Sequence, residues 1–208
     1  MKQKWLARQE VLKLRKYCKE REELDKAHGR WLGIRNRALI EFLLGTGIRA
    51  SECRDTQIGY LTLNTQNGTD PFIKVRTLKR KKKVFDTVTI EKELAKLLMG
   101  YIKELKRFKG KESVKDSSYL FAGRDGKKLT LVGLEKAVNG IFEKAGINKK
   151  HSVHSLRHTH GFYVYHENKN LKLVQIRLRH ANIQSSSIYT DVEPEEEQRT
   201  INGLFDFE

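Results

Sequence analysis

The side chains best suited to chemistry gather in the C-terminal third of this sequence. Within HSVHSLRHTH, residues 151–160, His154 and Arg157 lie three apart, so on a helix they share a face and can act on one ligand. His180 follows Arg157 by 23 residues, and Tyr189 follows His180 by nine. Arginine binds anions, histidine transfers protons near neutral pH, and tyrosine can serve as a covalent nucleophile. The set therefore suits covalent and acid–base chemistry on an anionic substrate.

A further arginine follows a glycine turn in the N-terminal half of the chain. Arg49 stands in GTGIRASE, residues 45–52, where the glycines can end one helix before the next begins. An isolated arginine is most often a surface or helix-capping residue. The preceding turn and the apolar residues around it favour a functional role for Arg49.

The histidine-rich segment also permits a metal site. His154 and His158 are four residues apart, as two metal ligands on one helix can be. The segment lacks the glutamate of an H-E-x-x-H motif, and no cysteine lies near it, so we expect no metal. His151, His158 and His160 are interpreted as structural or solvent-facing residues.

The charge of the chain is high and unevenly distributed. Its 208 residues include 42 lysines and arginines against 26 acids, a net charge of +16. The last 18 residues hold seven acids and one arginine, so residues 191–208 carry −6 and residues 1–190 carry +22. So basic a domain is expected to bind a polyanion, and nucleic acid is the commonest one in a cell. An anionic membrane surface is the alternative, but we find no basic amphipathic helix with an aromatic face.

Other features argue against secretion and membrane insertion. No run approaches the roughly 18 apolar residues of a membrane helix, and the N-terminus, MKQKWLARQE, has no apolar signal-like region. Cys18 and Cys53 lie far apart and form no C-x-x-C pair. We therefore expect a cytoplasmic protein without a disulfide framework or a zinc ribbon.

Hydrophobic periodicity predicts a mainly helical α+β fold with one small antiparallel sheet. Strands are predicted at 60–63, 72–76 and 84–90, with a charged hairpin tip at 80–83 and with Phe72, Val75 and Phe85 in the sheet core. Helices are predicted at 5–23 and 34–44, from 51, and at 94–108, 131–145, 154–166, 171–178 and 182–190. The lysines of the tip either keep the hairpin from aggregating or contact phosphates.

Three motifs, in this order, resemble those of the tyrosine recombinases: TGIRASE at 46–52, HSLRH at 154–158, and RH at 179–180 with a tyrosine nine residues after the histidine. That family includes the integrases of phages and conjugative elements and the Xer-type chromosome resolvases. The resemblance covers the chain from Trp5 to Thr190. It implies the fold of the family's catalytic domain, which is mainly helical with a small three-stranded antiparallel sheet.

The resemblance also assigns roles to individual residues. The family's catalytic residues correspond here to Arg49, Lys79, His154, Arg157, His180 and Tyr189, with Glu52 as support for the first arginine. Two arginines can clamp the non-bridging oxygens of a phosphodiester, so the reaction needs no metal ion or other cofactor. Tyrosine has a free pKa of about 10 and needs a base or a cationic setting, which either histidine could supply. Lys79 suits the general acid for the leaving 5′ hydroxyl, and Lys81 stays open because the hairpin length differs from that of the family.

Nearby basic residues are expected to contact the DNA backbone: Arg80, Lys81, Lys82, Lys83 and Arg179. Two residues depart from the family pattern. Arg179 stands where the family usually has glycine, and an arginine would be strained in a left-handed backbone conformation. Thr89 stands where many members have proline. Residues 1–190 are expected to form the catalytic domain, without the N-terminal core-binding domain of full recombinases. The acidic tail, residues 191–208, is expected to dock on a neighbouring subunit.

The function that the resemblance implies is site-specific DNA recombination, for integration or excision of a mobile element, through a 3′-phosphotyrosyl intermediate. The expected partners are duplex DNA with specific recombination sites, further copies in a homotetramer, and a directionality factor. Two alternatives are a type IB topoisomerase, which relaxes DNA without pairing sites, and a non-catalytic DNA-binding regulator. The presence of all six catalytic side chains argues against the regulator, because binding alone needs no nucleophile.

Overall fold

The computed structural model describes residues 4–64, 69–79, 82–123, 126–180 and 186, with the backbone alone at 77–79 and 82–83. The chain divides into two compact units, Met1–His160 (unit 1) and Gly161–Glu208 (unit 2). It is mainly helical with one three-stranded antiparallel sheet, so the predicted α+β class is confirmed. No helix in the described stretches is both long and apolar enough to cross a membrane.

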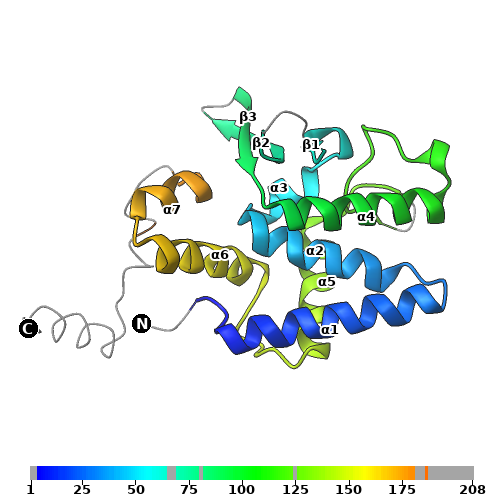
Figure 1. Ribbon diagram of the computed structural model, residues 1–208, viewed down its shortest axis with the longest axis horizontal. Helices are drawn as coiled ribbons and strands as arrows, with labels where there is room; N and C mark the ends of the chain where they lie inside the picture. The colour runs from blue at the N-terminus through cyan, green and yellow to red at the C-terminus, as the bar shows by residue number, and fades with distance from the viewer. Residues whose placement is uncertain (1–3, 65–68, 80–81, 124–125, 181–185, 187–208) are drawn as a thin grey trace, which may run out of the picture. The chain divides into compact units, whose positions relative to one another are not determined.

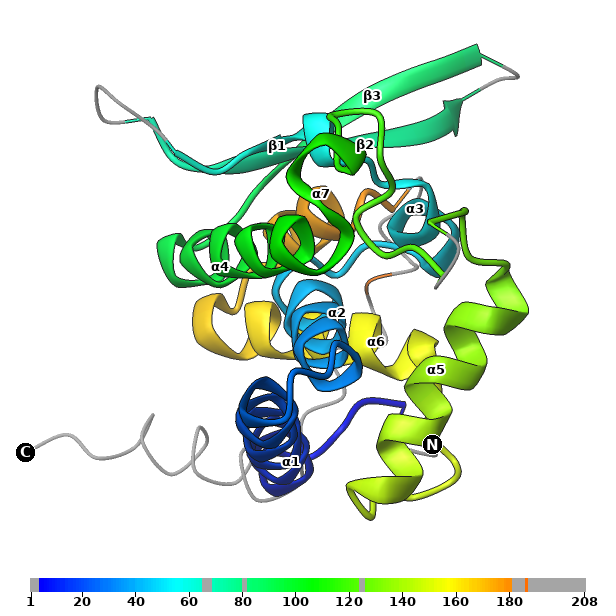
Figure 2. The ribbon, with the colours of Figure 1, turned by 90° about the vertical axis from the view of Figure 1, so that its right-hand side faces the viewer.

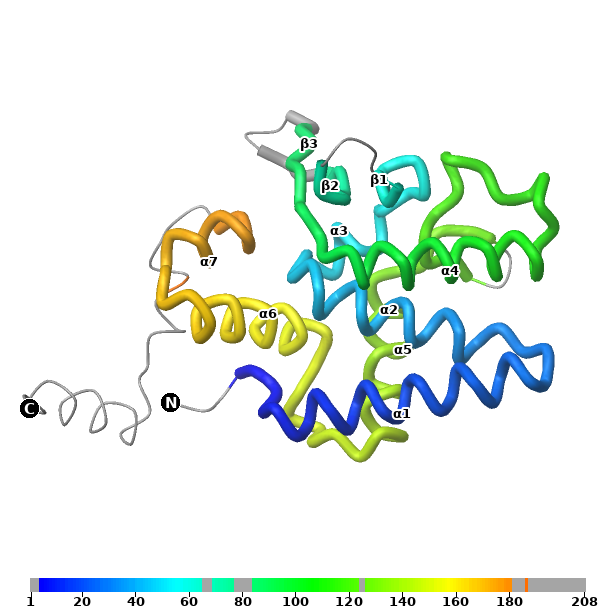
Figure 3. The backbone as a smooth tube through the Cα atoms, viewed as in Figure 1, coloured from blue at the N-terminus to red at the C-terminus, as the bar shows by residue number. Residues whose placement is uncertain are grey.

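Unit 1 is built on a layered set of helices. Figures 1 and 2 show α2 (Leu32–Thr46) between α1 (Arg8–Ala27) and α4 (Lys92–Lys109), with the sheet beyond α4. Helix α5 (Leu131–Lys144) crosses α1 and α2 and contacts both (Figure 3). The helices bury apolar side chains between them, including Val11, Leu14, Cys18, Leu39, Phe42, Leu98 and Leu134. In α1, the buried Val11, Leu14 and Cys18 lie three and four residues apart, as expected for one face of the helix predicted at 5–23.

A buried carboxylate closes the turn between α1 and α2. Asp25 Oδ2 accepts a hydrogen bond from the Gly33 N–H (2.7 Å), and Asp25 Oδ1 accepts one from Arg30 Nε (2.9 Å). The Asp25 side chain is only 1% exposed and also lies 3.2 Å from Arg21 Nη2. A Cβ on Gly33 would lie 2.4 Å from the Arg21 carbonyl oxygen, so this close approach of the two helices requires glycine.

Helix α2 ends in a left-handed glycine that leads into the short helix α3 (Ala50–Asp55). Gly47 has φ +59°, and its N–H donates to the Leu43 carbonyl oxygen at 3.1 Å. This is the glycine-terminated helix predicted from the GTG sequence. The chain then enters α3 with Arg49 at the N-cap.

The sheet has the order β1–β2–β3, and both strand pairs are antiparallel. β1 (Leu61–Thr62) follows the 3₁₀ turn Ile58–Tyr60 and pairs with β2 (Phe72–Lys79). β2 pairs with β3 (Lys82–Thr89), in a ladder that reaches as far as Lys79 opposite Lys82. β2 thus runs three residues beyond its predicted end, and β3 begins two residues before its predicted start, so Lys82 and Lys83 belong to β3 rather than to the hairpin tip.

The prediction that Phe85 belongs to the sheet core is wrong. Its side chain is 48% exposed and meets the Tyr60 ring edge-on at 5.1 Å. Side chains alternate between the two faces of a strand, and the buried Val88 lies an odd number of residues away from Phe85. Phe85 therefore shares the outer face with Arg76, its partner in the register.

Helix α6 (Val153–Asn168) begins in unit 1 and runs into unit 2, where α7 (Leu171–Leu178) follows. Val174 and Leu178 form a small buried core in unit 2. Partly buried side chains of α6 pack against this core: Phe162, Val164 and Tyr165. Apart from residue 186, the helix predicted at 182–190 lies outside the described residues.

Candidate active site

Arg49 is held in place by a nearly buried carboxylate one turn further along α3. The Arg49 N–H donates to Glu52 Oε2 at 2.7 Å, and Arg49 Nη1 donates to Glu52 Oε1 at 3.0 Å. The Glu52 side chain is 6% exposed, whereas that of Arg49 is 41% exposed. A carboxylate in the first turn of a helix both caps the helix and matches its dipole. Glu52 therefore fixes the backbone and the head group of Arg49 while part of the guanidinium stays open to solvent.

Arg157 lies near the C-terminal end of unit 1 and contacts the same turn, the one between α2 and α3 that carries Arg49. It is buried on α6, and its Nη1 donates to the Gly47 carbonyl oxygen at 2.5 Å. Gly47 lies only two residues before Arg49, and it is 110 residues from Arg157 in the sequence. The turn between α2 and α3 thus brings the two arginines predicted for the site to one place.

His154 lies on the exposed side of α6, close to both arginines. Partial burial lowers the pKa of His154, and the positive charges of Arg157 and Arg49 lower it further. The ring also meets the His158 ring edge-on at 5.1 Å. The lowered pKa keeps the imidazole neutral at neutral pH, so His154 is able to accept a proton.

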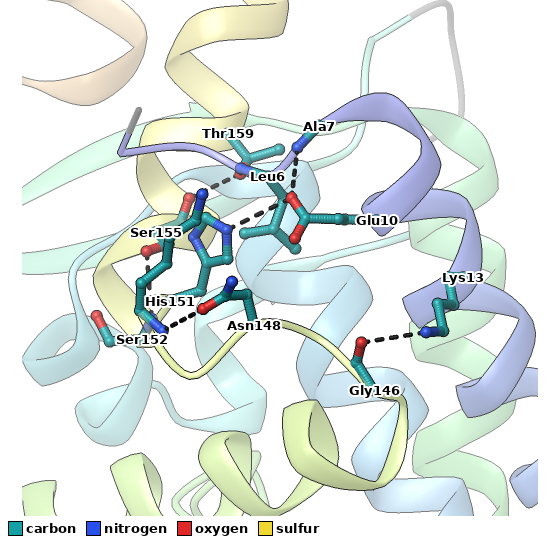
Figure 4. Close-up of polar contacts among 11 residues, drawn as sticks. Leu6, Ala7, Glu10, Lys13, Gly146, Asn148, His151, Ser152, Ser155 and Thr159 are labelled. Atoms are coloured by element: carbon teal, nitrogen blue, oxygen red, sulfur yellow. Dashed lines mark hydrogen bonds and ion pairs between the residues drawn. The ribbon is translucent and has the colours of Figure 1, made fainter. Parts of the chain in front are cut away.

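The first turns of α6 are held by contacts to the N-terminal segment (Figure 4). The Leu6 N–H donates to Thr159 Oγ1 at 3.0 Å, and this hydroxyl donates to the Ser155 carbonyl oxygen at 2.7 Å. His151 Nε2 lies 3.4 Å from Glu10 Oε2. These contacts fix the stretch of helix that carries His154 and Arg157.

The other side of α6 rests on the end of α2. His160 Nδ1 lies 2.7 Å from the Leu44 carbonyl oxygen, and the side chains of His160 and His151 are buried. Both histidines therefore serve the framework of α6, which is the structural one of the two roles that the sequence left open for them. His158 is partly exposed and packs against His154.

His180 lies in unit 2, directly after a residue with a strained backbone at the end of α7. Arg179 has φ +54° and ψ +44°, so an arginine adopts here the left-handed conformation that favours glycine. The His180 N–H donates to the Gln175 carbonyl oxygen at 3.0 Å. His180 Nδ1 forms a hydrogen bond with Ser186 Oγ at 2.9 Å.

Sequence reasoning missed Ser186, although it is fully buried and lies three residues before Tyr189. Residues six apart do not share a face of a helix, and no strand is predicted in this stretch, so periodicity gave no signal for Ser186. Its position within a run of three serines before Tyr189 was the only local hint. The Gly47 carbonyl group, which binds Arg157, is a main-chain contact that residue types do not reveal.

The remaining predicted residues are only partly described. Lys79 ends β2, where its backbone alone is described, and Lys82 and Lys83 begin β3 in the same way. Arg80, Lys81 and Tyr189 lie outside the described residues. The described part of the chain contains no group of three or more histidines, cysteines or acids that could hold a metal ion.

Comparison with known proteins identifies the family. The profile of the phage integrase family matches residues 4–196. The chain belongs to the phage integrase family. The resemblance to tyrosine recombinases drawn from TGIRASE, HSLRH and the final tyrosine is therefore confirmed.

The similar curated proteins carry the name tyrosine recombinase. The chain is 30% identical over 161 residues to XerC of Anoxybacillus flavithermus, which covers 77% of this chain and 51% of that protein. It is 30% identical over 181 residues to XerC of Bacillus subtilis, covering 86% and 57%, and 32% identical over 158 residues to XerH of Campylobacter jejuni, covering 76% and 41%. The chain thus spans about half the length of these relatives.

Solved structures agree with the predicted fold. A post-cleavage complex of the XerH site-specific recombinase with palindromic difH substrate matches with a TM-score of 0.73 at 27% identity, covering 96% of this chain and 52% of that one. XerA recombinase matches with a TM-score of 0.74 at 23% identity, covering 98% and 66%, and supports the fold alone. The mainly helical fold with a small sheet is thus the catalytic-domain fold that the sequence led us to expect.

Proposed function

We propose that this chain is the catalytic part of a site-specific DNA recombinase that cleaves and rejoins strands through a 3′-phosphotyrosyl link at Tyr189. One observation above all supports the proposal: Arg49, Arg157 and His154 gather at the turn between α2 and α3. Two oriented guanidinium groups beside a neutral imidazole suit the charge that builds up during attack on a phosphodiester. The assignments of Lys79, His180 and Tyr189 come from the resemblance to the family.

In the proposed reaction, the Tyr189 oxygen attacks the phosphorus atom, and the bond from phosphorus to the 5′ oxygen breaks. Arg49 and Arg157 bind the non-bridging oxygens, and Glu52 holds Arg49 in place. His154 takes the phenolic proton, and Lys79, or alternatively Lys81, gives a proton to the leaving 5′ oxygen. The 5′ hydroxyl of a partner strand then attacks the phosphotyrosyl bond and releases the tyrosine. One phosphodiester replaces another, so no nucleotide cofactor is consumed.

The proposed substrate is duplex DNA with specific recombination sites. The net charge of +22 on residues 1–190 favours binding to a polyanion. The XerH relative forms a complex with its difH substrate. Phosphate contacts release counterions, so the affinity for DNA is expected to fall steeply as salt rises. Arg80, Lys81, Lys82, Lys83 and Arg179 are the proposed backbone contacts.

Strand exchange between two sites requires four nucleophiles, so we assign the working form to a homotetramer, with a directionality factor controlling its outcome. Residues 1–190 serve as the catalytic domain in this proposal, and the tail at 191–208 docks on a neighbouring subunit. The assembly works in the cytoplasm, on the DNA of the nucleoid or of a mobile element.

A covalent trapping experiment tests the proposal. The full chain is incubated with a pool of nicked duplexes whose sequence is randomised around the nick. Cleavage next to the nick releases a short fragment and leaves the protein covalently attached to the DNA. Wild-type protein is expected to form an adduct that survives SDS, and Tyr189→Phe to form none. Tyr165→Phe, which removes a hydroxyl from a packing residue of unit 2, is the matched control and keeps the adduct.

Further outcomes separate the alternatives. DNA binding without an adduct from the wild-type chain would favour the regulator. Relaxation of a supercoiled plasmid without any requirement for paired sites would favour a type IB topoisomerase. Sequencing of the trapped DNA identifies the preferred site.

A further inference from the structure

The backbone of His180 is held rigidly within unit 2. Arg179, in the left-handed conformation, turns the chain at the end of α7, and the His180 N–H donates to the Gln175 carbonyl oxygen at 3.0 Å. The Gln175 side-chain amide donates to the His180 carbonyl oxygen at 3.3 Å. Since the backbone is fixed, the features of the imidazole left to be determined are its ring orientation and its tautomer.

Ser186 acts on both of these features. Its Oγ lies 2.9 Å from His180 Nδ1, and the serine has no solvent-exposed surface. The hydroxyl can donate to an unprotonated Nδ1, or it can accept from a protonated Nδ1. In the second arrangement, the hydroxyl proton would itself need another buried acceptor. Donation from Ser186 to Nδ1 satisfies both groups with one hydrogen bond, and it places the ring proton on Nε2.

We propose that Ser186 is a positioning residue for strand cleavage: its hydroxyl holds His180 as the Nε2–H tautomer, which donates a hydrogen bond to an oxygen of the scissile phosphate. This inference rests on the proposed function. It adds a residue that the catalytic motifs do not contain. Ser186 also lies three residues before Tyr189, so the contact ties the histidine to the chain segment that carries the nucleophile.

The tautomer matters because the two forms present opposite groups to the substrate. An Nε2–H group donates to a non-bridging oxygen and stabilises the negative charge that grows there in the transition state. The Nδ1–H tautomer would present a lone pair from Nε2 to the same oxygen, and the two would repel. His180 neither loses nor gains a proton in this role, because its Nε2–H group only donates a hydrogen bond.

The tautomer can be measured directly. The full chain, labelled with ¹⁵N in its histidines, is studied by long-range ¹H–¹⁵N NMR at neutral pH, where the two nitrogen shifts distinguish the tautomers. We expect Nε2–H for His180 in the wild type and in Ser186→Thr, which keeps the hydroxyl, and a mixture in Ser186→Ala. Ser187→Ala, the same change at the neighbouring serine, is the control and is expected to leave the His180 signals unchanged.

Single-turnover cleavage of the trapped nicked duplex supplies the functional readout. Ser186→Ala is expected to slow adduct formation roughly tenfold, with DNA affinity changed by less than about twofold, and Ser186→Thr to restore the rate. An Nδ1–H tautomer in the wild type would overturn the proposal, as would an unchanged tautomer and rate in Ser186→Ala. If the wild-type chain forms no adduct, the proposed function fails, and the NMR spectra still decide the His180–Ser186 contact.

Discussion

At the scale of single residues, the notable contact is a buried arginine bound to a main-chain oxygen. Arg157 keeps its charge at any physiological pH, and its guanidinium meets the Gly47 carbonyl group at the end of α2. A helix C-terminus carries partial negative charge, which favours a cation there. The same turn holds Arg49 through Glu52, so a local feature of the backbone orients two cations.

The electrostatics of this cluster can be tested through His154. Partial burial lowers the pKa of His154 below its usual 6.5, and the positive charges of Arg157 and Arg49, which disfavour the imidazolium form, lower it further. Arg49→Gln is expected to raise that pKa back towards 6.5, as measured by an NMR titration of the His154 ring in the free protein. Arg15→Gln removes an arginine that pairs with Glu41 on the surface and serves as the control. An unchanged pKa in Arg49→Gln would show that the two side chains are not neighbours in solution.

At the scale of elements, the α1–α2 joint depends on close contact at Gly33. A methyl group there would meet the Arg21 carbonyl oxygen at 2.4 Å and Asp25 Oδ2 at 2.9 Å. Gly33→Ala is therefore expected to lower the free energy of unfolding by about 1–3 kcal/mol, as measured by urea denaturation.

Gly140 in α5 offers the matched control, because a Cβ there would meet nothing within 4 Å. Gly140→Ala is expected to raise the free energy of unfolding by about 0.5–1 kcal/mol, since alanine loses less backbone entropy in a helix. Similar effects at the two glycines would contradict the packing described for the α1–α2 joint.

The support of α6 predicts a pH dependence of stability. Burial lowers the pKa of His151 below its usual 6.5, and Lys150 adds to this, although Glu10 acts in the opposite direction. The unfolded chain therefore binds a proton at this imidazole at a higher pH than the folded chain does. The free energy of unfolding is expected to fall as pH drops below about 6.5, and it should fall less steeply in His151→Gln. Urea denaturation between pH 8 and 5 measures both slopes, and equal slopes would remove the prediction.

At the scale of the whole molecule, the charge is divided between a basic body and an acidic tail. The proposed docking of the tail, residues 191–208 with a net charge of −6, on a neighbouring basic subunit can be tested by deletion. Without the tail, tetramer assembly on paired DNA sites is expected to weaken more than cleavage of a nicked duplex slows. Mass photometry on DNA and the trapping assay measure the two effects. Equal losses in both would count against a docking role.

The sequence alone determined the family, the class of fold and the order of the elements. Its evidence was local: the apolar period of α1, the glycine that ends α2, and motifs that are recognised from residue types and spacing alone. Alternation of side chains along a strand is local too, yet it does not say which of the two faces is buried. Phe85 was therefore assigned to the core when the packing of the unit leaves it outside.

Only the tertiary structure decided which distant groups meet. The bond from Arg157 to Gly47 joins positions 110 residues apart, and the bond from the Leu6 N–H to Thr159 joins positions 153 apart. Both involve a main-chain group, which every residue type offers, so no sequence pattern marks them. The hydrogen bond between His180 and Ser186 likewise joins two positions that do not share a face of a helix, so the helical period does not predict it. Such contacts arise from chain packing, and packing is the property that a one-dimensional pattern does not contain.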